Sequence, residues 1–294
     1  VRDFATKELE PGAAKVDEEE KFPNDNFRKM AELGLMGVSI AEEYGGSGGD
    51  SIHLAIATEE IARACGSTAL TVAAHALCTT PLNLFGNEEQ KRKYLVPLAQ
   101  GKLGAFGLTE PGAGSDAAAA KTTAVRDGDW WVLNGSKIFI TNGGFADVLI
   151  IVAVTDKSKG TRGISAFLVE ADTPGLSIGK IEHKMGIRGS RTGEVIMQDC
   201  RLPAGNLLGN EGDGFKIAMM TLDRSRPEIG AQAVGIAQGA LDFAAKIGVT
   251  GRVHDVDLDA AIGDGGVLGQ DCDAALALQV AAIEDALDDD LIVA

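Results

Sequence analysis

One eleven-residue stretch, FGLTEPGAGSD at residues 106–116, concentrates groups that can hold a polar or charged ligand. Gly112 and Gly114 allow the backbone to approach a ligand closely or to adopt a positive φ. Thr109 and Ser115 place hydroxyl groups beside backbone N–H groups. A turn built in this way can bind a phosphate, a pyrophosphate or the polar edge of a ring.

The glycine spacing also fits a simpler structure. Ser115 and Asp116 can hydrogen-bond to their own backbone in an ordinary β-turn. The stretch is not a P-loop, because it contains no Gly-Lys-Ser or Gly-Lys-Thr, and it lacks the G-x-G-x-x-G spacing of a dinucleotide-binding fingerprint. The glycines alone therefore leave both a ligand site and a plain turn open.

The charge of the chain argues against one class of partner. The 294 residues carry a net charge of −16, which disfavours binding to nucleic acid. Most of this charge lies in residues 251–294, which have one Arg and eleven Asp or Glu, whereas residues 1–250 have 26 basic and 32 acidic residues. The nearly balanced part can still hold a local basic site for an anionic ligand.

The cysteines and the apolar runs indicate the compartment. Cys65, Cys78, Cys200 and Cys272 form no Cys-x-x-Cys pair, so we expect reduced thiols rather than a zinc site or disulfides. The first residues show no signal-peptide pattern, and no apolar run reaches the roughly 18 residues of a membrane span. We therefore predict a cytoplasmic protein with no metal and no membrane segment.

The chain before the glycine-rich stretch is predicted to be helical. Residues 1–103 show helical patterns, as in 51–64, where apolar residues recur near helical spacing. Asn87 followed by Gln90 predicts a capping box at the start of a helix. This part is predicted to be an N-terminal helical domain.

Strand patterns begin near Gly104. The run WVLNGSKIFIT, residues 131–141, has Asn134-Gly135 between two β-prone segments, which predicts a hairpin turn. Residues 147–155, 163–170 and 193–199 follow as further strands without a long helix between them. We predict a middle antiparallel β-barrel or β-sandwich domain over residues 104–212.

Helical character returns after Gly214, with Pro227 expected at a turn or at a first helical position. Residues 213–250 are predicted to start a C-terminal helical bundle that is incomplete. Residues 251–272 are rich in Asp and Gly and predict a loop, and 273–287 can form one amphipathic helix. The predicted fold class is thus α+β, with an acidic tail over 251–294.

Several motifs together resemble the acyl-CoA dehydrogenase family. FGLTEPGAGSD is similar to the first signature of that family, and FITNGG at residues 139–144 is similar to its second flavin segment. The resemblance runs in order from residue 1 to about 245. It continues through VEADTPG at 169–175, KMGIR at 184–188, GDGF at 212–215 and LDRSRPEIGAQAVGIAQG at 222–239.

The resemblance implies a cofactor and an activity. The family binds FAD and oxidises an acyl-CoA thioester to the trans-2-enoyl-CoA, with electrons passing to an electron-transferring flavoprotein. Residues expected to contact FAD are Phe106, Leu108, Thr109, Gly114, Ser115, Phe139, Ile140 and Thr141. Residues expected to contact the acyl-CoA are Ser115, Asp223, Arg224, Ser225 and Arg226. By resemblance the complete protein is expected to form a homo-oligomer, commonly a homotetramer.

The chain departs from the family pattern in two ways. The glutamate base that most members carry far into the C-terminal domain is not found, and Ser225 occupies the position where other members carry it. The match also ends abruptly near Gly248, which is expected of a truncated product, a reading-frame error or a different natural tail. These departures leave the catalytic residue unknown. The alternatives are a non-catalytic flavin- or CoA-binding fragment or subunit, an acyl-CoA oxidase, and an enoyl-CoA reductase.

Overall fold

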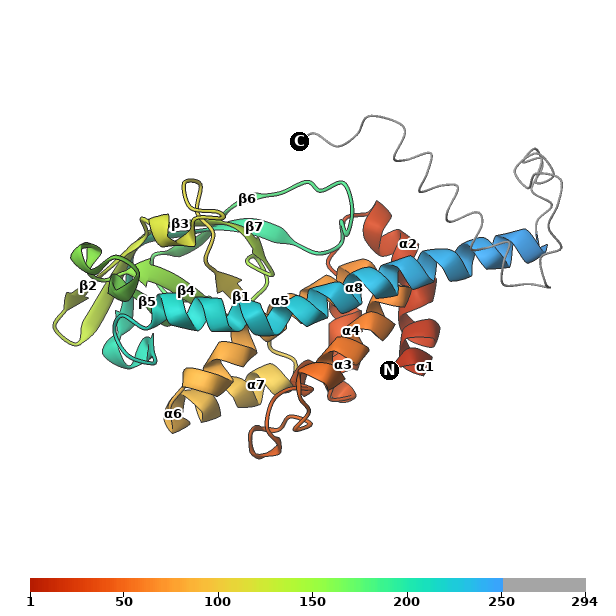
Figure 1. Cartoon of the computed structure of the whole chain (residues 1–294), viewed down its shortest axis with the longest axis horizontal. Helices are drawn as coiled ribbons and strands as arrows, with labels where there is room; N and C mark the ends of the chain where they lie inside the picture. The colour runs from red at the N-terminus through yellow and green to blue at the C-terminus, as the bar shows by residue number, and fades with distance from the viewer. Residues whose placement is uncertain (251–294) are drawn as a thin grey trace, which may run out of the picture. The chain divides into compact units, whose positions relative to one another are not determined.

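The computed structural model describes residues 1–250 and the side chains of residues 1–246 (Figure 1). One compact unit extends from Val1 to Ile236, and a second begins at Ala237. The loop and helix predicted within 251–294 lie outside the described residues. No helix among the described residues is long and apolar enough to cross a membrane.

The first part of the chain is helical, as predicted. A π-helical turn, Ala5–Leu9, joins the first two helices, and another, Lys91–Leu95, joins the last two. The helices are α1 (Arg2–Phe4), α2 (Glu10–Glu18), α3 (Asn24–Glu32), α4 (Ser51–Ala64), α5 (Gly66–Phe85), α6 (Glu88–Gln90) and α7 (Val96–Ala99).

Local capping explains where two of these helices begin. The Asn87 side chain accepts from the Gln90 N–H at 2.8 Å, and the Gln90 side chain accepts from the Asn87 N–H at 3.1 Å, which confirms the predicted capping box. Asp50 caps α4 by accepting from the N–H groups of Ile52 and His53. Helix α4 spans the residues 51–64 that the apolar spacing indicated.

The middle of the chain forms one open sheet, not a closed barrel, so the barrel prediction was wrong. The strand order is β6-β7-β3-β2-β4-β5-β8, and β1 pairs with β4 beside this path. Most pairs are antiparallel, but β4 pairs in parallel with both β1 and β2. The strands are β1 (Gly104–Gly107), β2 (Thr123–Asp127), β3 (Trp130–Thr141), β4 (Val148–Val154), β5 (Ile164–Glu170), β6 (Leu176–Ile181), β7 (Thr192–Pro203) and β8 (Leu207–Leu208).

Asn134-Gly135 does not form the predicted hairpin turn. It lies inside β3, where the register against β7 shifts between Leu133 and Gly135, as at a β-bulge. Gly135 has a φ of +144°, and the Asn134 side chain exchanges hydrogen bonds with Asp199 on β7. The sequence correctly indicated a backbone position that favours glycine. A β-bulge favours glycine there as a tight turn does, so the dipeptide alone did not distinguish the two.

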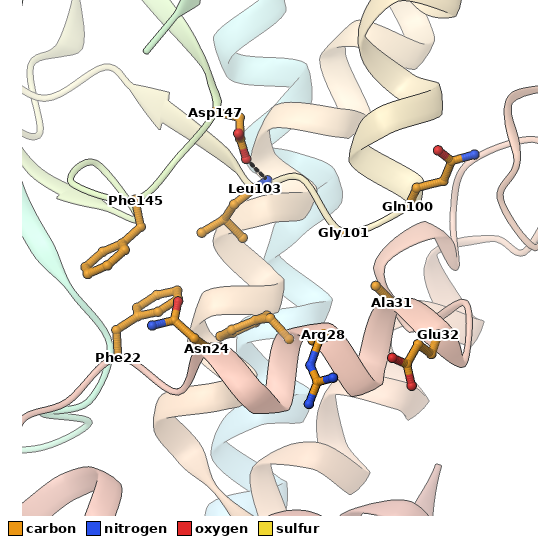
Figure 2. A pocket seen from close by; sticks show the side chains of 11 residues that line it. Phe22, Asn24, Arg28, Ala31, Glu32, Gln100, Gly101, Leu103, Phe145 and Asp147 are labelled. Carbon is orange, nitrogen blue, oxygen red and sulfur yellow. Dashed lines mark hydrogen bonds between the residues drawn. The ribbon is translucent and has the colours of Figure 1, made fainter. Parts of the chain in front are cut away.

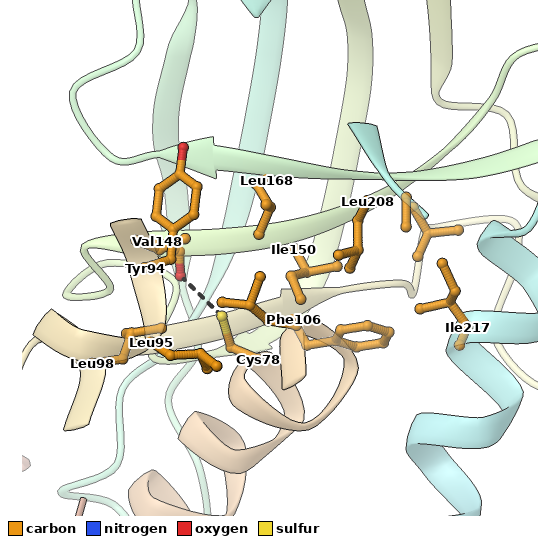
Figure 3. Close-up of a cluster of buried hydrophobic side chains, with 14 of the residues drawn as sticks. Cys78, Tyr94, Leu95, Leu98, Phe106, Val148, Ile150, Leu168, Leu208 and Ile217 are labelled. Atoms are coloured by element: carbon orange, nitrogen blue, oxygen red, sulfur yellow. Dashed lines mark hydrogen bonds between the residues drawn. The ribbon is translucent and has the colours of Figure 1, made fainter. Parts of the chain in front are cut away.

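A shared apolar core joins the helices to the sheet (Figure 3). Cys78 and Leu82 of α5 and Leu95 of the π-helical turn pack with Ile150 of β4 and Leu168 of β5, and all five side chains are at most 1% exposed. The helical layer and the sheet therefore pack against each other, and α5 contacts β1 of the sheet.

Helix α8 spans Gly214–Thr250. Pro227 lies inside this helix, so the prediction of a turn or a first helical position was wrong. Pro227 is exposed, so the Asp223 carbonyl that it cannot pair can face water. Up to Ile236, buried polar residues recur every three or four positions along one face of α8, at Thr221, Ser225, Glu228 and Gln232. Gln232 donates to the Gly66 carbonyl at 3.3 Å, which ties α8 to the start of α5.

Candidate functional site

A cavity of about 470 Å³ gathers the residues that the sequence predicted for the cofactor. All eight line it, from Phe106 to Ser115 on one wall and from Phe139 to Thr141 on another. Helix α5 contributes Ala74 and Leu77, and α8 contributes Phe215, Met219, Leu222 and Arg226. Segments far apart in the sequence thus converge on one hollow of a size common for small-molecule sites.

The first wall contains a tight turn. Glu110 and Ala113 exchange backbone hydrogen bonds of 3.0 and 3.1 Å around Pro111-Gly112. No atom lies within 4 Å of where a Cβ on Gly114 would stand, so the backbone there is open to a ligand. The segment thus contains a tight turn at Glu110–Ala113 and also lines the cavity.

The second wall is built on an unusual backbone. Phe139 has a φ of +58°, rare for an aromatic residue, where the register of β3 against β7 shifts between Lys137 and Ile140. Phe139 is 60% exposed, although Lys137, two residues earlier on the same strand, is fully buried. Such strain persists only where the surroundings hold it, and it is common at ligand sites. It turns an aromatic face toward the cavity.

A buried asparagine supports that wall from behind. Asn142 also has a positive φ, of +66°, and is fully buried. Its amide donates to the Thr71 carbonyl at 3.0 Å and to the Gly104 carbonyl at 3.1 Å. The segment after β3 is thereby fixed to α5 and to β1.

The residues predicted for the acyl-CoA separate on α8. Arg226 lines the cavity and forms a loose ion pair with Asp223 at 3.7 Å, while Asp223 and Arg224 are exposed and outside the lining. Ser225 is buried, and its hydroxyl donates to the Leu222 carbonyl at 3.0 Å. Of the four residues at 223–226, only the cation Arg226 lines the cavity, and none of them places a carboxylate base there.

Apart from Arg226, the residues on the helical side of the cavity were not predicted from the sequence. Phe215, Met219, Leu222 and Arg226 recur at intervals of four, three and four residues, which is the spacing of one helix face. That periodicity was available as a signal. Ala74 and Leu77 gave none, because small and aliphatic residues on α5 are equally typical of a helix core.

Two buried titratable groups near this region have shifted pKa values. Burial lowers the pKa of His75 to about 4, and its ring bonds to the Met36 carbonyl and the Gly104 N–H fit the neutral form. Burial raises the pKa of Glu228 to about 8. Its Oε2 makes no hydrogen bond to any atom of the described residues. Both groups are therefore uncharged at neutral pH.

A second cavity of about 490 Å³ lies beside α3 (Figure 2). Phe22 stacks on Phe145 with ring centroids 4.3 Å apart, and Arg28, Glu32 and Asp147 also line this hollow. None of the predicted site residues lies there. Among the described residues, no group of three or more His, Cys, Asp or Glu is placed to hold a metal ion.

Comparison with known families matches most of the described chain. Residues 1–102 match the model of the acyl-CoA dehydrogenase N-terminal domain. Residues 105–200 match the model of the acyl-CoA dehydrogenase middle domain. The two matches meet at the start of β1, where the first wall of the cavity begins.

Individual relatives agree with these matches. The chain is 54% identical over 246 residues to the short-chain specific acyl-CoA dehydrogenase of Clostridium acetobutylicum, covering 83% of this chain and 65% of the relative. It is 53% identical over 249 residues to acryloyl-CoA reductase (NADH) of Anaerotignum propionicum, covering 84% of this chain and 63% of that relative. The chain thus spans less than two thirds of the length of these relatives.

A solved structure shares the fold. Butyryl-CoA dehydrogenase from Megasphaera elsdenii superposes with a TM-score of 0.84 at 44% identity, over 97% of this chain and 74% of that one.

Proposed function

The chain belongs to the acyl-CoA dehydrogenase family, and we propose that it forms part of an FAD-dependent oxidoreductase that converts an acyl-CoA thioester to its trans-2-enoyl-CoA. The observation that carries this proposal is the convergence of both flavin-like segments and Arg226 on one cavity. Members of this family use FAD.

The residues present fit a flavin. Phe106, Leu108, Phe139 and Ile140 offer apolar and aromatic surface for a flat ring system. Thr109 and Thr141 add hydroxyl groups at the same cavity, and the open backbone at Gly114 allows close approach. FAD, when bound, supplies the acceptor for the hydride that leaves the substrate Cβ.

The residues of this chain orient the reactants and exclude water. We propose that the Thr141 hydroxyl donates a hydrogen bond to the reactive edge of the flavin, and that the Phe139 ring shields one side of it. Removing bulk water in this way strengthens each polar contact within the cavity. The acyl chain would lie along the α5 and α8 side, where Leu77, Met219 and Leu222 are apolar.

The thioester end of the substrate would meet the polar side of the cavity. We propose that Ser115 and Arg226 contact the polar parts of the CoA, because a hydroxyl and a cation suit carbonyl and phosphate oxygens. A neutral serine hydroxyl is too weak a base to take the α-proton unaided, and the Ser225 hydroxyl is buried and donates to the Leu222 carbonyl. That base stays unassigned within the described residues.

The remaining assignments follow from the family. We propose an electron-transferring flavoprotein as acceptor and a homo-oligomer as the complete assembly, with residues 213–250 opening a C-terminal helical bundle. The domain limits 1–103 and 104–212 and the cytoplasmic location stay predictions. A non-catalytic flavin- or CoA-binding subunit and an acyl-CoA oxidase remain the alternatives to the dehydrogenase.

A second candidate reaction is the reverse one, reduction of an enoyl-CoA. The observation that favours it is the 53% identity to an acryloyl-CoA reductase, which equals the similarity to the dehydrogenases. The same cavity residues would serve both directions.

FAD binding tests the proposal directly. We expect the flavin fluorescence of FAD to be quenched as the chain is titrated into it. Phe139→Ala should weaken binding about five- to thirtyfold, because the variant loses an aromatic face worth about 1–2 kcal/mol. Phe243→Ala is the matched control, since Phe243 is 65% exposed on α8 and outside the cavity. Equal affinity of both variants would contradict the site.

Adding acyl-CoA thioesters of several chain lengths to the FAD-loaded chain then separates the alternatives. Bleaching of the flavin without oxygen indicates dehydrogenation, whereas binding without bleaching supports the non-catalytic subunit. Reoxidation of a reduced flavin by an enoyl-CoA indicates the reductase, and rapid reoxidation by oxygen alone indicates the oxidase.

A further inference from the structure

A buried ion pair lies behind the cavity, and its charges contact neither water nor the cavity directly. Lys137 of β3 is 0% exposed and Glu110 is 6% exposed. The Lys137 Nζ lies 2.6 Å from the Glu110 Oε1. Burial of charge is costly unless every polar atom is satisfied, so a fold retains such a pair only where the surroundings complete it.

Backbone groups of residues 108–122 complete both partners. The Lys137 Nζ also donates to the Leu108 carbonyl at 3.1 Å. The Glu110 carboxylate accepts from the Lys121 N–H at 2.7 Å and from the Thr122 N–H at 3.1 Å. The pair thus holds both ends of the turn that carries Thr109, Gly114 and Ser115.

The same pair belongs to the second wall by its position in the chain. Lys137 comes two residues before Phe139, at the register shift of β3. Between them, the Ile138 N–H donates to the Thr109 carbonyl at 2.9 Å. Three contacts therefore join residues 108–110 to residues 137–138, and two of them are made by the Lys137 ammonium.

We propose that the Lys137–Glu110 ion pair is a positioning pair that holds the two walls of the cavity in one geometry and, as a neutral unit, sets the electrostatic environment of the flavin. The electrostatic claim about the flavin rests on the proposed function, whereas the claim about the two walls does not. Neither residue touches the ligand space, since neither lines the cavity.

Hydrogen exchange of the chain without flavin tests the mechanical part. In Glu110→Gln we expect amide exchange about tenfold faster in both 106–116 and 138–142. The charge-assisted contact with Lys137 becomes a weaker contact to a neutral amide oxygen, and the glutamine NH₂ group cannot accept from the Lys121 and Thr122 N–H groups. The control is Glu170→Gln, which removes a carboxylate that also lies 2.6 Å from a lysine, Lys93, but away from this cavity. Faster exchange near residue 110 alone, with 138–142 unchanged, would overturn the proposal.

A double variant covers the case in which Glu110→Gln does not fold. Glu110→Gln combined with Lys137→Met buries no charge, so it avoids the isolated ammonium that the single variant leaves. Exchange in both segments should still rise above that of Glu170→Gln. If the double variant keeps wild-type protection in 138–142, the walls are not coupled through this pair.

The flavin potential tests the electrostatic part. In Glu110→Gln the unpaired Lys137 cation should favour the more negative reduced flavin, so the midpoint potential should become more positive, and the double variant should return toward the wild type. A purely structural role would lower the melting temperature and leave the potential unchanged, which would contradict this part. Failure of the wild-type chain to bind FAD would instead contradict the proposed function, while the exchange experiment would still decide the coupling.

Discussion

Individual buried side chains in this chain are kept uncharged by their surroundings. Burial lowers the pKa of His75 to about 4 and so keeps its ring neutral, and in that form its Nε2–H can donate to the Met36 carbonyl while its Nδ1 accepts from the Gly104 N–H. Glu228 is held protonated by burial alone, which raises its pKa to about 8. Burial of the two groups destabilises the fold to different degrees. Both ring nitrogens of His75 are hydrogen-bonded, whereas the Glu228 Oε2 has no hydrogen-bond partner among the described residues.

Glu228→Gln should stabilise the chain, increasingly as the pH rises. The folded-state pKa of about 8 is above the ordinary value of 4.5, so between these values the folded state holds a proton that the unfolded state has released. Stability is therefore lost as the pH rises through this window, by up to about 5 kcal/mol. Glutamine has no such proton to lose.

Urea unfolding at about pH 5 and about pH 8.5 measures this difference. We expect Glu228→Gln to match the wild type at the lower pH and to exceed it at the higher one. Glu89→Gln makes the same chemical substitution at an exposed position and serves as the control. A constant difference between Glu228→Gln and the wild type at both pH values would contradict the assigned protonation state.

At the residue scale, the sequence identified cavity-lining residues where several of them lie in one short motif. The eight residues that the stretch 106–116 and the segment 139–141 predicted for the cofactor all line one cavity. Lys137 and Glu110 could not be assigned in this way, because a lysine on a strand is ordinarily exposed and the burial of this one depends on tertiary packing. Asp223 and Arg224 came from the same motif as Arg226, but the helix turns them away from the cavity lining.

At the element scale, local rules predicted helix boundaries better than strand connections. The capping box at Asn87 depends on residues three apart and was correct. The Asn134-Gly135 hairpin was wrong because β3 continues through it and pairs with β7, a strand more than fifty residues later. A dipeptide identifies a glycine-requiring backbone, but distant partners decide whether it is a turn or a bulge.

Gly135→Ala should therefore be costly. A Cβ at this position would lie 2.6 Å from the Thr122 Oγ1 and 2.8 Å from the Thr122 Cα, and the φ of +144° already disfavours a side chain. We expect a loss of about 2–4 kcal/mol. Gly128→Ala is the matched control, because Gly128 has a φ of +58° and no atom within 4 Å of its Cβ position. It should lose only about 1 kcal/mol.

Thermal or urea unfolding of the two glycine variants separates backbone strain from steric overlap. Equal losses would mean that Thr122 moves aside without cost and that only the backbone angle matters.

At the scale of the whole described molecule, the core in Figure 3 makes the helices and the sheet interdependent. Ile150 on β4 is 0% exposed and belongs to the cluster that includes Cys78 and Leu95 from the helical part. Loss of its side chain removes contacts from both layers at once. The helical and sheet parts of residues 1–236 should therefore unfold together.

Ile150→Ala should lower the free energy of unfolding by about 2–5 kcal/mol, because it leaves a cavity in a closely packed core. Trp130 and Trp131 both lie on β3, so tryptophan fluorescence follows the sheet, whereas far-UV circular dichroism follows chiefly the helices. The two signals should shift to the same lower midpoint. Val125→Ala, at a side chain that is 62% exposed, should stay within about 0.5 kcal/mol of the wild type. Separate midpoints for the two signals would show independent folding.

The open strand order described above has a consequence for self-association. Strand β6 ends the sheet on one side, so its outer backbone groups have no strand partner among the described residues. Exposed edges of this kind invite pairing with a second molecule and lead to aggregation. Here β6 is only six residues long, its register shifts between Ile178 and Ile181, and the charged Lys180 stands within the irregular part. An incoming strand would find neither a continuous row of hydrogen-bonding groups nor an uncharged surface, so the edge itself discourages fibril growth.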